Sequence, residues 1–301
     1  MVVFKLYTFK SEHKRIKRLT EAIYRPLDIF RQSSNEEIRN IIEDTLYYEN
    51  ILENIVEWLV IGLDLGLLSV LLINFGEIPL RGAFPFDTSH LPFYVIATII
   101  QTGTASVFSI TLAAMNELIF SYIRWINSQF RILTIAYEEN FVQDILAKII
   151  NSESASFESF RNSNHYGKNL YLNDIVTELN SIFNSTMLVQ VSSSCCIICL
   201  TCFQLVMGDL KSEYKLLFFF GGALTELFNF CWFGSELISV SDCVSDGVWL
   251  SGWEKNLDFE VKSLMLMSLI TAKNPLEMRA GNFFVISLET FITVSKCNTV
   301  K

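Results

Sequence analysis

Long apolar stretches alternate with charged ones along this chain, and four of them come close to the roughly 20 residues that a membrane-crossing helix needs. The four stretches are 55–75, 91–120, 186–207 and 214–240. Two shorter apolar stretches, 1–9 and 280–297, predict the end of one more span and a last span. The pattern therefore predicts an all-α fold: a polytopic membrane helical bundle in which residues 1–301 form a single transmembrane domain.

The composition agrees with this prediction. Hydrophobic residues make up 51% of the 301 residues and charged residues only 18%, below the roughly 25% charge of a typical soluble domain. A soluble all-α protein with buried helices is the alternative. Four apolar stretches of nearly membrane-spanning length in one chain argue against it.

The basic residues of the connecting segments predict how the chain is oriented. Segments 10–53, 121–185 and 241–279 hold eight, five and four Lys and Arg residues, whereas connectors 76–90 and 208–213 hold one each. Because Lys and Arg accumulate on the cytoplasmic side of membrane proteins, we expect the three basic segments to be cytoplasmic. The connector 76–90 and the C-terminus are then extracellular.

The connector 76–90 carries Pro79 and Pro85 and is followed by Pro92. Proline restricts the backbone, so two interpretations are open. The connector is either a stiff external lid over a space between helices or a plain tight connection between two spans.

The cytoplasmic segments predict helical extensions of the bundle. Ser34 and Glu37 have the spacing of a helix N-terminal capping box. Apolar residues recur at spacings of three and four over 126–141, 172–183 and 261–272, which is typical of helices that bury one face. These faces need a cytoplasmic helical bundle or a subunit interface to pack on.

No group of residues in the sequence is typical of an enzyme. The three histidines lie in predicted loops, and none has a carboxylate at the spacing of a metal site or a catalytic triad. Cys196, Cys199 and Cys202 form overlapping C-x-x-C pairs, but inside an apolar span they are interpreted as small packing residues. We therefore expect no enzymatic activity, no metal and no cofactor.

Three carboxylates lie inside apolar stretches, at Asp64, Glu226 and Glu289. Charge within a bilayer is costly and is usually functional. Each of them either faces the protein interior as a neutral or paired group or takes part in function, and Glu289 is the one placed to line a pore.

Three motifs resemble those of a known family, the insect odorant receptors, which have seven helices and are unrelated to G-protein-coupled receptors. IPLRGAFPFDTS resembles the second external loop of that family. CWFGSELISVSDCVSDGVWLSGWEKN resembles its Cys-x-x-Gly-x-x-Leu segment, with Cys231, Gly234, Leu237 and Trp253 at matching positions and Trp249 where Tyr is usual. AKNPLEMRAGNFFVISLETFITVSK resembles the closing pattern of Pro-Leu, Ala-Gly and Ser-Leu-x-x-Phe.

The resemblance implies an odorant receptor, the volatile-ligand-binding subunit of a heteromeric ligand-gated cation channel in olfactory sensory neurons. The implied partners are a shared co-receptor, with which the chain forms a heterotetramer, a small volatile organic ligand and membrane lipid, but no nucleic acid. The implied location is the plasma membrane, crossed several times, with the C-terminus extracellular.

The resemblance also implies where the ligand binds and where ions pass. The ligand pocket is expected between helices in the outer half of the membrane, at Ser69, Leu72, Ile73, Phe93, Tyr94, Ala97, Gln101, Phe219 and Phe220. The last span is expected to be the pore helix, with a lining of Val285, Leu288, Phe291 and Glu289. A hydrophobic constriction of this kind gates by dewetting.

Set against the family pattern, the chain is expected to be incomplete at both ends. MVVFKLYTF corresponds to the cytoplasmic end of the second helix of the family, and the chain ends inside the last helix. The alternatives are a gustatory receptor of the same channel superfamily, a G-protein-coupled receptor, which predicts the opposite orientation, and a non-functional truncated remnant.

Overall fold

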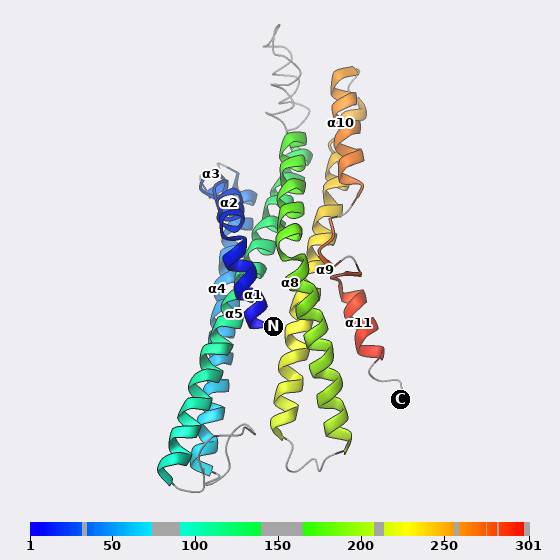
Figure 1. Cartoon of the computed structure of the whole chain (residues 1–301). Helices are drawn as coiled ribbons and strands as arrows, with labels where there is room; N and C mark the ends of the chain where they lie inside the picture. Colours follow the sequence, from blue (N-terminus) through cyan, green and yellow to red (C-terminus); the bar gives the residue numbers. More distant parts are fainter. Residues whose placement is uncertain are drawn as a thin grey trace. The chain divides into compact units, whose positions relative to one another are not determined.

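The computed structural model describes residues 1–31, 35–73, 91–139, 165–207, 214–255, 259–274, 276–281 and 283–297. Helices dominate these residues (Figure 1), which confirms the predicted all-α bundle. The long helices are α4 (Glu36–Ile73), α5 (Leu91–Glu139), α8 (His165–Met207) and α9 (Tyr214–Leu250). The short elements are α1 (Val2–Ser11), α2 (His13–Tyr24), α3 (Leu27–Arg31), the 3-10 helix η1 (Trp253–Lys255), α10 (Phe259–Ala272), strands β1 (Arg279–Ala280) and β2 (Phe284–Val285), and α11 (Leu288–Cys297).

Each long helix continues beyond the apolar stretch that predicted it. The α8 helix contains the predicted span 186–207 but has 43 residues. At a rise of about 1.5 Å per residue, a helix of this length exceeds the roughly 30 Å hydrocarbon core of a bilayer. The predicted extensions 126–141, as far as Glu139, and 172–183 are therefore continuous with predicted spans, whereas 261–272 lies in the separate helix α10. The predicted connector 76–90 lies outside the described residues.

Two helical segments of the described chain are long and apolar enough to cross a membrane, Phe93–Glu138 in α5 and Asn169–Gln204 in α8. In the α5 segment only 17% of the apolar window is buried inside the protein. Ile99, Val107 and Phe108 are among its exposed side chains. A core helix of a soluble protein would bury such residues, so this exposure suits contact with lipid.

The start of α4 differs in detail from the predicted capping box. The Glu37 backbone N–H donates to Asn35 Oδ1 at 2.8 Å, so the helix is capped by asparagine, one of the preferred N-cap residues. Ser34, which the sequence pattern favoured, lies outside the described residues.

The chain divides into two compact units. The first consists essentially of Val3–Glu43 and Tyr122–Lys301, and the second of Asp44–Ser121. The second unit therefore holds most of α4 and the first part of α5. Within it, the Ser121 hydroxyl at the end of the α5 part donates a hydrogen bond to the Glu49 carboxylate on α4.

The core of the first unit is built around α8, which contacts α9, α10, α2 and β1 and lies beside α9 (Figure 1). The apolar residues predicted to share one face over 126–141 are buried here: Ile126, Phe130, Leu133 and Tyr137. Those predicted over 172–183 are also buried: Leu172, Ile175, Val176, Leu179, Ile182 and Phe183. Both predicted faces are confirmed over the described residues; Phe141, the last residue predicted for the first face, lies outside them.

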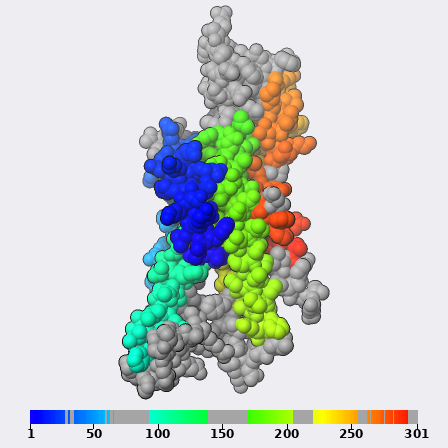
Figure 2. Space-filling view, viewed as in Figure 1, coloured from blue at the N-terminus to red at the C-terminus, as the bar shows by residue number. Residues whose placement is uncertain are grey.

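The N-terminal helices cover one side of α8, and Figure 2 shows their surface directly against it. Ile16, Leu19 and Ile23 bury the inner face of α2. At the edge of this contact, Arg15 donates from Nε to Glu178 Oε1 at 2.8 Å and from Nη2 to Glu178 Oε2 at 3.0 Å. This bidentate geometry is the strong form of an Arg–carboxylate pair.

We expect the α2–α8 contact to lose stability in acid. Hydrogen bonds from Arg15 lower the pKa of Glu178, which precedes the predicted span. A lowered folded-state pKa adds stability above the ordinary Glu pKa of about 4.3, and this stability is lost as the pH falls through the lowered value. Because both side chains are partly exposed, the contribution is about 1 kcal/mol or less.

The measurement is the thermal unfolding midpoint of the detergent-solubilised chain from about pH 6 to about pH 3. In the Glu178→Gln variant the side chain cannot ionise, so its midpoint should fall less with acidification than that of the parent chain. An equal fall in both would contradict the assignment to Glu178.

Candidate functional site

The last helix of the chain is held against α9 by a close backbone approach. Cys231, Gly234 and Leu237 lie at spacings of three on α9, so they share one face; Cys231 and Leu237 are buried. A Cβ atom added to Gly234 would lie 2.2 Å from the backbone oxygen of Ile286. Glycine is therefore required where the chain leading into α11 crosses α9.

Four hydrogen bonds fix the segment between α10 and α11 to its neighbours. The Leu276 N–H donates to Ser241 Oγ at 3.0 Å and the Leu288 N–H to Ser235 Oγ at 2.7 Å, both on α9. On α8, Asn180 Oδ1 accepts from the Arg279 N–H at 3.1 Å, and the Asn184 backbone oxygen accepts from the Gly281 N–H at 3.3 Å. The segment is thus clamped between α8 and α9.

Sequence reasoning did not single out Ser235, Ser241 or Asn180. Serine and asparagine are common on helices, and nothing in their spacing shows that a distant backbone N–H will meet them. The only signal was indirect, because Ser235 follows the motif residue Gly234.

The predicted last span, 280–297, is helical only from Leu288 onward. Before it, β1 and β2 pair in an antiparallel hairpin, with Arg279 opposite Val285 and Ala280 opposite Phe284. Gly281 has a φ of +62°, a left-handed conformation that glycine adopts without strain. Apolar composition alone could not distinguish this short hairpin from the start of a helix.

The four candidate pore residues fall on different parts of this structure. Val285 lies in β2, whereas Leu288, Glu289 and Phe291 lie on α11. The Phe291 ring packs edge-to-face on Phe228 of α9, with centroids 5.5 Å apart. Glu289 is exposed and sits in the first turn of α11, where the helix dipole favours a negative charge.

A buried lysine accompanies one of the intramembrane carboxylates. Lys5 on α1 is only 1% exposed, and its Nζ lies 5.6 Å from the centroid of the Phe230 ring on α9. Glu226, one helical turn before Phe230, interacts electrostatically with Lys5. The carboxylate therefore has an opposite charge nearby, as the structural interpretation of Glu226 required. Sequence reasoning missed Lys5 because it took 1–9 simply as the apolar end of a span.

The predicted ligand residues all lie on helices, divided between the two units. In the second unit Tyr94 and Ala97 are buried on one face of α5, with Gln101 one turn further on and partly buried. Phe93 points to another face and is 44% exposed. Ser69, Leu72 and Ile73 lie on α4, but the structure does not describe their side chains. In the first unit Phe219 and Phe220 lie in the second turn of α9, and Phe220 is half-buried.

Comparison with known proteins identifies the family. The profile of the 7tm odorant receptor family matches residues 1–298, nearly the whole chain. The chain belongs to the odorant receptor family. The members of this family are membrane receptors, and the match favours an odorant receptor over the gustatory and G-protein-coupled alternatives.

Curated relatives include odorant receptors of Drosophila melanogaster. Odorant receptor 85f is 24% identical over 125 residues, which cover 41% of this chain and 32% of the relative. Odorant receptor 13a is 22% identical over 233 residues, which cover 72% of this chain and 54% of the relative. The chain thus matches between about a third and about half of the length of these two receptors.

The fold is similar to that of a solved insect olfactory receptor. Two structures of OR5 from Machilis hrabei superpose on this odorant receptor family member with TM-scores of 0.73 and 0.68, at 15% and 16% identity. The first covers 99% of this chain and 75% of OR5; the second, a complex of OR5 with eugenol, covers 93% and 72%. At this identity the likeness shows the shared helical fold.

Proposed function

We propose that this chain is the odorant-binding subunit of a heteromeric ligand-gated cation channel in the plasma membrane. In this proposal the channel is a heterotetramer with a shared co-receptor, and α11 is the helix that lines its pore. The observation that carries the proposal is the clamping of α11 on α9 through Gly234 and Ser235, in a chain whose family match spans residues 1–298.

The α9 helix gives a mechanical route from ligand to pore. Its outer end carries Phe219 and Phe220, proposed ligand contacts, and its middle carries the clamp on α11. A ligand that shifts α9 shifts the start of α11 with it, because packed elements move as units rather than deforming continuously. Movement of Leu288 and Phe291 then opens a hydrophobic constriction.

The other proposed ligand contacts are those of α4 and α5, in the outer half of the membrane. Apolar and aromatic walls with a few polar groups suit small volatile organic molecules. Tyr94, Ala97 and Gln101 supply such a surface along one face of α5. The extracellular C-terminus and cytoplasmic basic segments follow from the distribution of Lys and Arg.

The test is co-expression with an odorant receptor co-receptor and recording of currents evoked by a panel of small volatile compounds. For an active compound we expect Ala97→Leu, which fills part of the buried α5 face, to raise the half-maximal concentration about tenfold, as a pocket contact of about 1.4 kcal/mol would.

The matched control is Ala105→Leu, the same change at a partly exposed position on α5, which should leave the half-maximal concentration unchanged. Surface labelling confirms that both variants reach the membrane. The absence of any compound-evoked current with the co-receptor present at the surface would refute the proposed function.

A further inference from the structure

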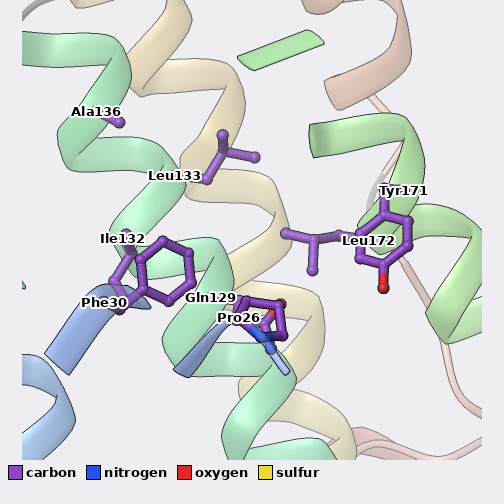
Figure 3. A pocket seen from close by; sticks show the side chains of 8 residues that line it. All are labelled: Pro26, Phe30, Gln129, Ile132, Leu133, Ala136, Tyr171 and Leu172. Carbon is purple, nitrogen blue, oxygen red and sulfur yellow. The ribbon is translucent and has the colours of Figure 1, made fainter. Parts of the chain in front are cut away.

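A cavity lies in the first unit, and none of the proposed odorant contacts lines it. It has a volume of about 160 Å³ and is lined by Pro26, Phe30, Gln129, Ile132, Leu133, Ala136, Tyr171 and Leu172. Figure 3 shows these side chains converging from three directions: the α2–α3 corner, the last third of α5 and the start of α8. All of these residues belong to the first unit.

The shape of this cavity is fixed by hydrogen bonds around its edge. Gln129 Nε2 donates to the backbone oxygen of Ile23 at 2.8 Å, and the Tyr171 hydroxyl donates to the backbone oxygen of Ala22 at 3.2 Å. Both bonds hold the end of α2 in place, one from α5 and one from α8. The cavity, which is partly open to the surface, is therefore lined by elements that are tied to one another.

The lining selects for apolar ligands of limited size. Ile132, Leu133 and Leu172 are each less than 5% exposed, and their aliphatic side chains offer no partner for several water molecules. A closed apolar cavity of about 150 Å³ binds benzene, and this partly open cavity has a similar volume and a mainly apolar lining. A ligand of one aromatic ring fits a volume of about 160 Å³.

One polar atom in this apolar lining favours ligands that donate a hydrogen bond. Gln129 uses its amide N–H group for Ile23, and its carboxamide oxygen accepts no hydrogen bond from the described residues. This oxygen is not among the fully buried unpartnered atoms of the described residues, so it stays accessible at the cavity wall, where a hydrogen bond adds selectivity. A ring that carries a single hydrogen-bond donor can supply this bond.

We propose that this cavity is a second binding site, which takes a single-ring aromatic molecule with one hydroxyl group. All of the lining residues lie in segments that the sequence assigns to the cytoplasm, 10–53 and 121–185, so the ligand reaches the site from the aqueous phase rather than as part of a lipid. The site contacts α3, α5 and α8 together, so its occupancy stabilises their packing.

Photolabelling of the purified full-length chain tests this site without relying on channel activity. A trifluoromethyl phenyl diazirine is photolysed with the protein, and labelled residues are located by mass spectrometry. We expect labelling of peptides containing Phe30 or Ile132 to be saturable and to be prevented by p-cresol. Toluene, which lacks the hydroxyl, should need a several-fold higher free concentration for the same protection.

The decisive variant is Ala136→Leu, whose larger side chain occupies the void. It should reduce the protectable labelling about tenfold, whereas the control Ala105→Leu should leave it unchanged. Ala136→Leu is expected to fold because it fills empty space, and its thermal unfolding midpoint checks this. Labelling that p-cresol does not prevent, equal protection by toluene and p-cresol, or full protectable labelling in a folded Ala136→Leu chain would each overturn the proposal.

Discussion

Replacing Gly234 by alanine is expected to detach the last helix from α9. The added Cβ would lie 2.2 Å from the backbone oxygen of Ile286, and a backbone atom cannot move aside as a side chain can. Overpacking of this kind costs about 1–3 kcal/mol. The separation also removes the hydrogen bond from the Leu288 N–H to Ser235, so the amide of Leu288 should exchange with solvent faster.

Two other glycines of α9 allow the same substitution to be compared at positions where the added Cβ atom has less close neighbours or none. A Cβ at Gly247 would meet a methyl group of Thr134 at 2.8 Å, and one at Gly222 would meet nothing within 4 Å. We expect Gly247→Ala to destabilise less than Gly234→Ala, since the nearest backbone atom, the Thr134 oxygen, lies at 3.1 Å rather than 2.2 Å. Gly222→Ala should be neutral or slightly stabilising, because alanine favours helix.

The measurements are the thermal unfolding midpoint and hydrogen–deuterium exchange over residues 283–291 in the purified chain. If Gly234→Ala left both unchanged, or if Gly222→Ala had the larger effect, the close approach to Ile286 would not be what holds α11. In the co-expressed channel, Gly234→Ala should also abolish ligand-evoked current under the proposed function.

The second large effect is expected when one member of the Lys5–Glu226 pair is removed. Lys5 is 1% exposed and lies over the Phe230 ring, and Glu226 interacts with it electrostatically. Glu226 is half-buried whereas Lys5 is buried, so removing Glu226 leaves a buried ammonium uncompensated, which costs up to about 3–5 kcal/mol. Glu226→Gln should therefore lower the unfolding midpoint strongly, and Lys5→Met, which leaves only a half-buried carboxylate unpaired, should lower it less.

A double-mutant cycle separates the interaction between the two charges from the effect of shortening or replacing each side chain. The double variant Lys5→Met/Glu226→Gln should be destabilised by much less than the sum of the single changes, because it leaves no buried charge unpaired. The control is Lys10→Met, on the same helix but exposed, which should have little effect. Additive single and double changes would show that the two charges are not coupled.

The helices and their buried faces could be predicted because they depend on local spacing. Ile126, Phe130 and Tyr137 recur at the helical period, and the side that repeats is the side that the structure buries. The alternation of apolar and charged stretches likewise predicted a helical membrane bundle, since only helices and closed barrels satisfy the backbone within lipid.

The clamp on α11 could be predicted only in part. The Cys-x-x-Gly-x-x-Leu spacing indicated that Cys231, Gly234 and Leu237 share a helix face, but not what that face meets. Ser235 and Asn180 were missed because their partners are backbone N–H groups about 50 and 100 residues away. A contact between residues so far apart leaves no periodic pattern in the sequence.

The sequence by itself therefore determined the long helices of this protein and the family to which it belongs, because these are encoded in composition, period and motif within short stretches. The tertiary structure alone decided which elements meet. It brought Lys5 close to Glu226, replaced the first part of the last predicted span by a hairpin, and left a void beside Ala136 where three helices fail to fill space. These features arise from the packing of side chains distant in sequence, and packing depends on shape in three dimensions rather than on local pattern.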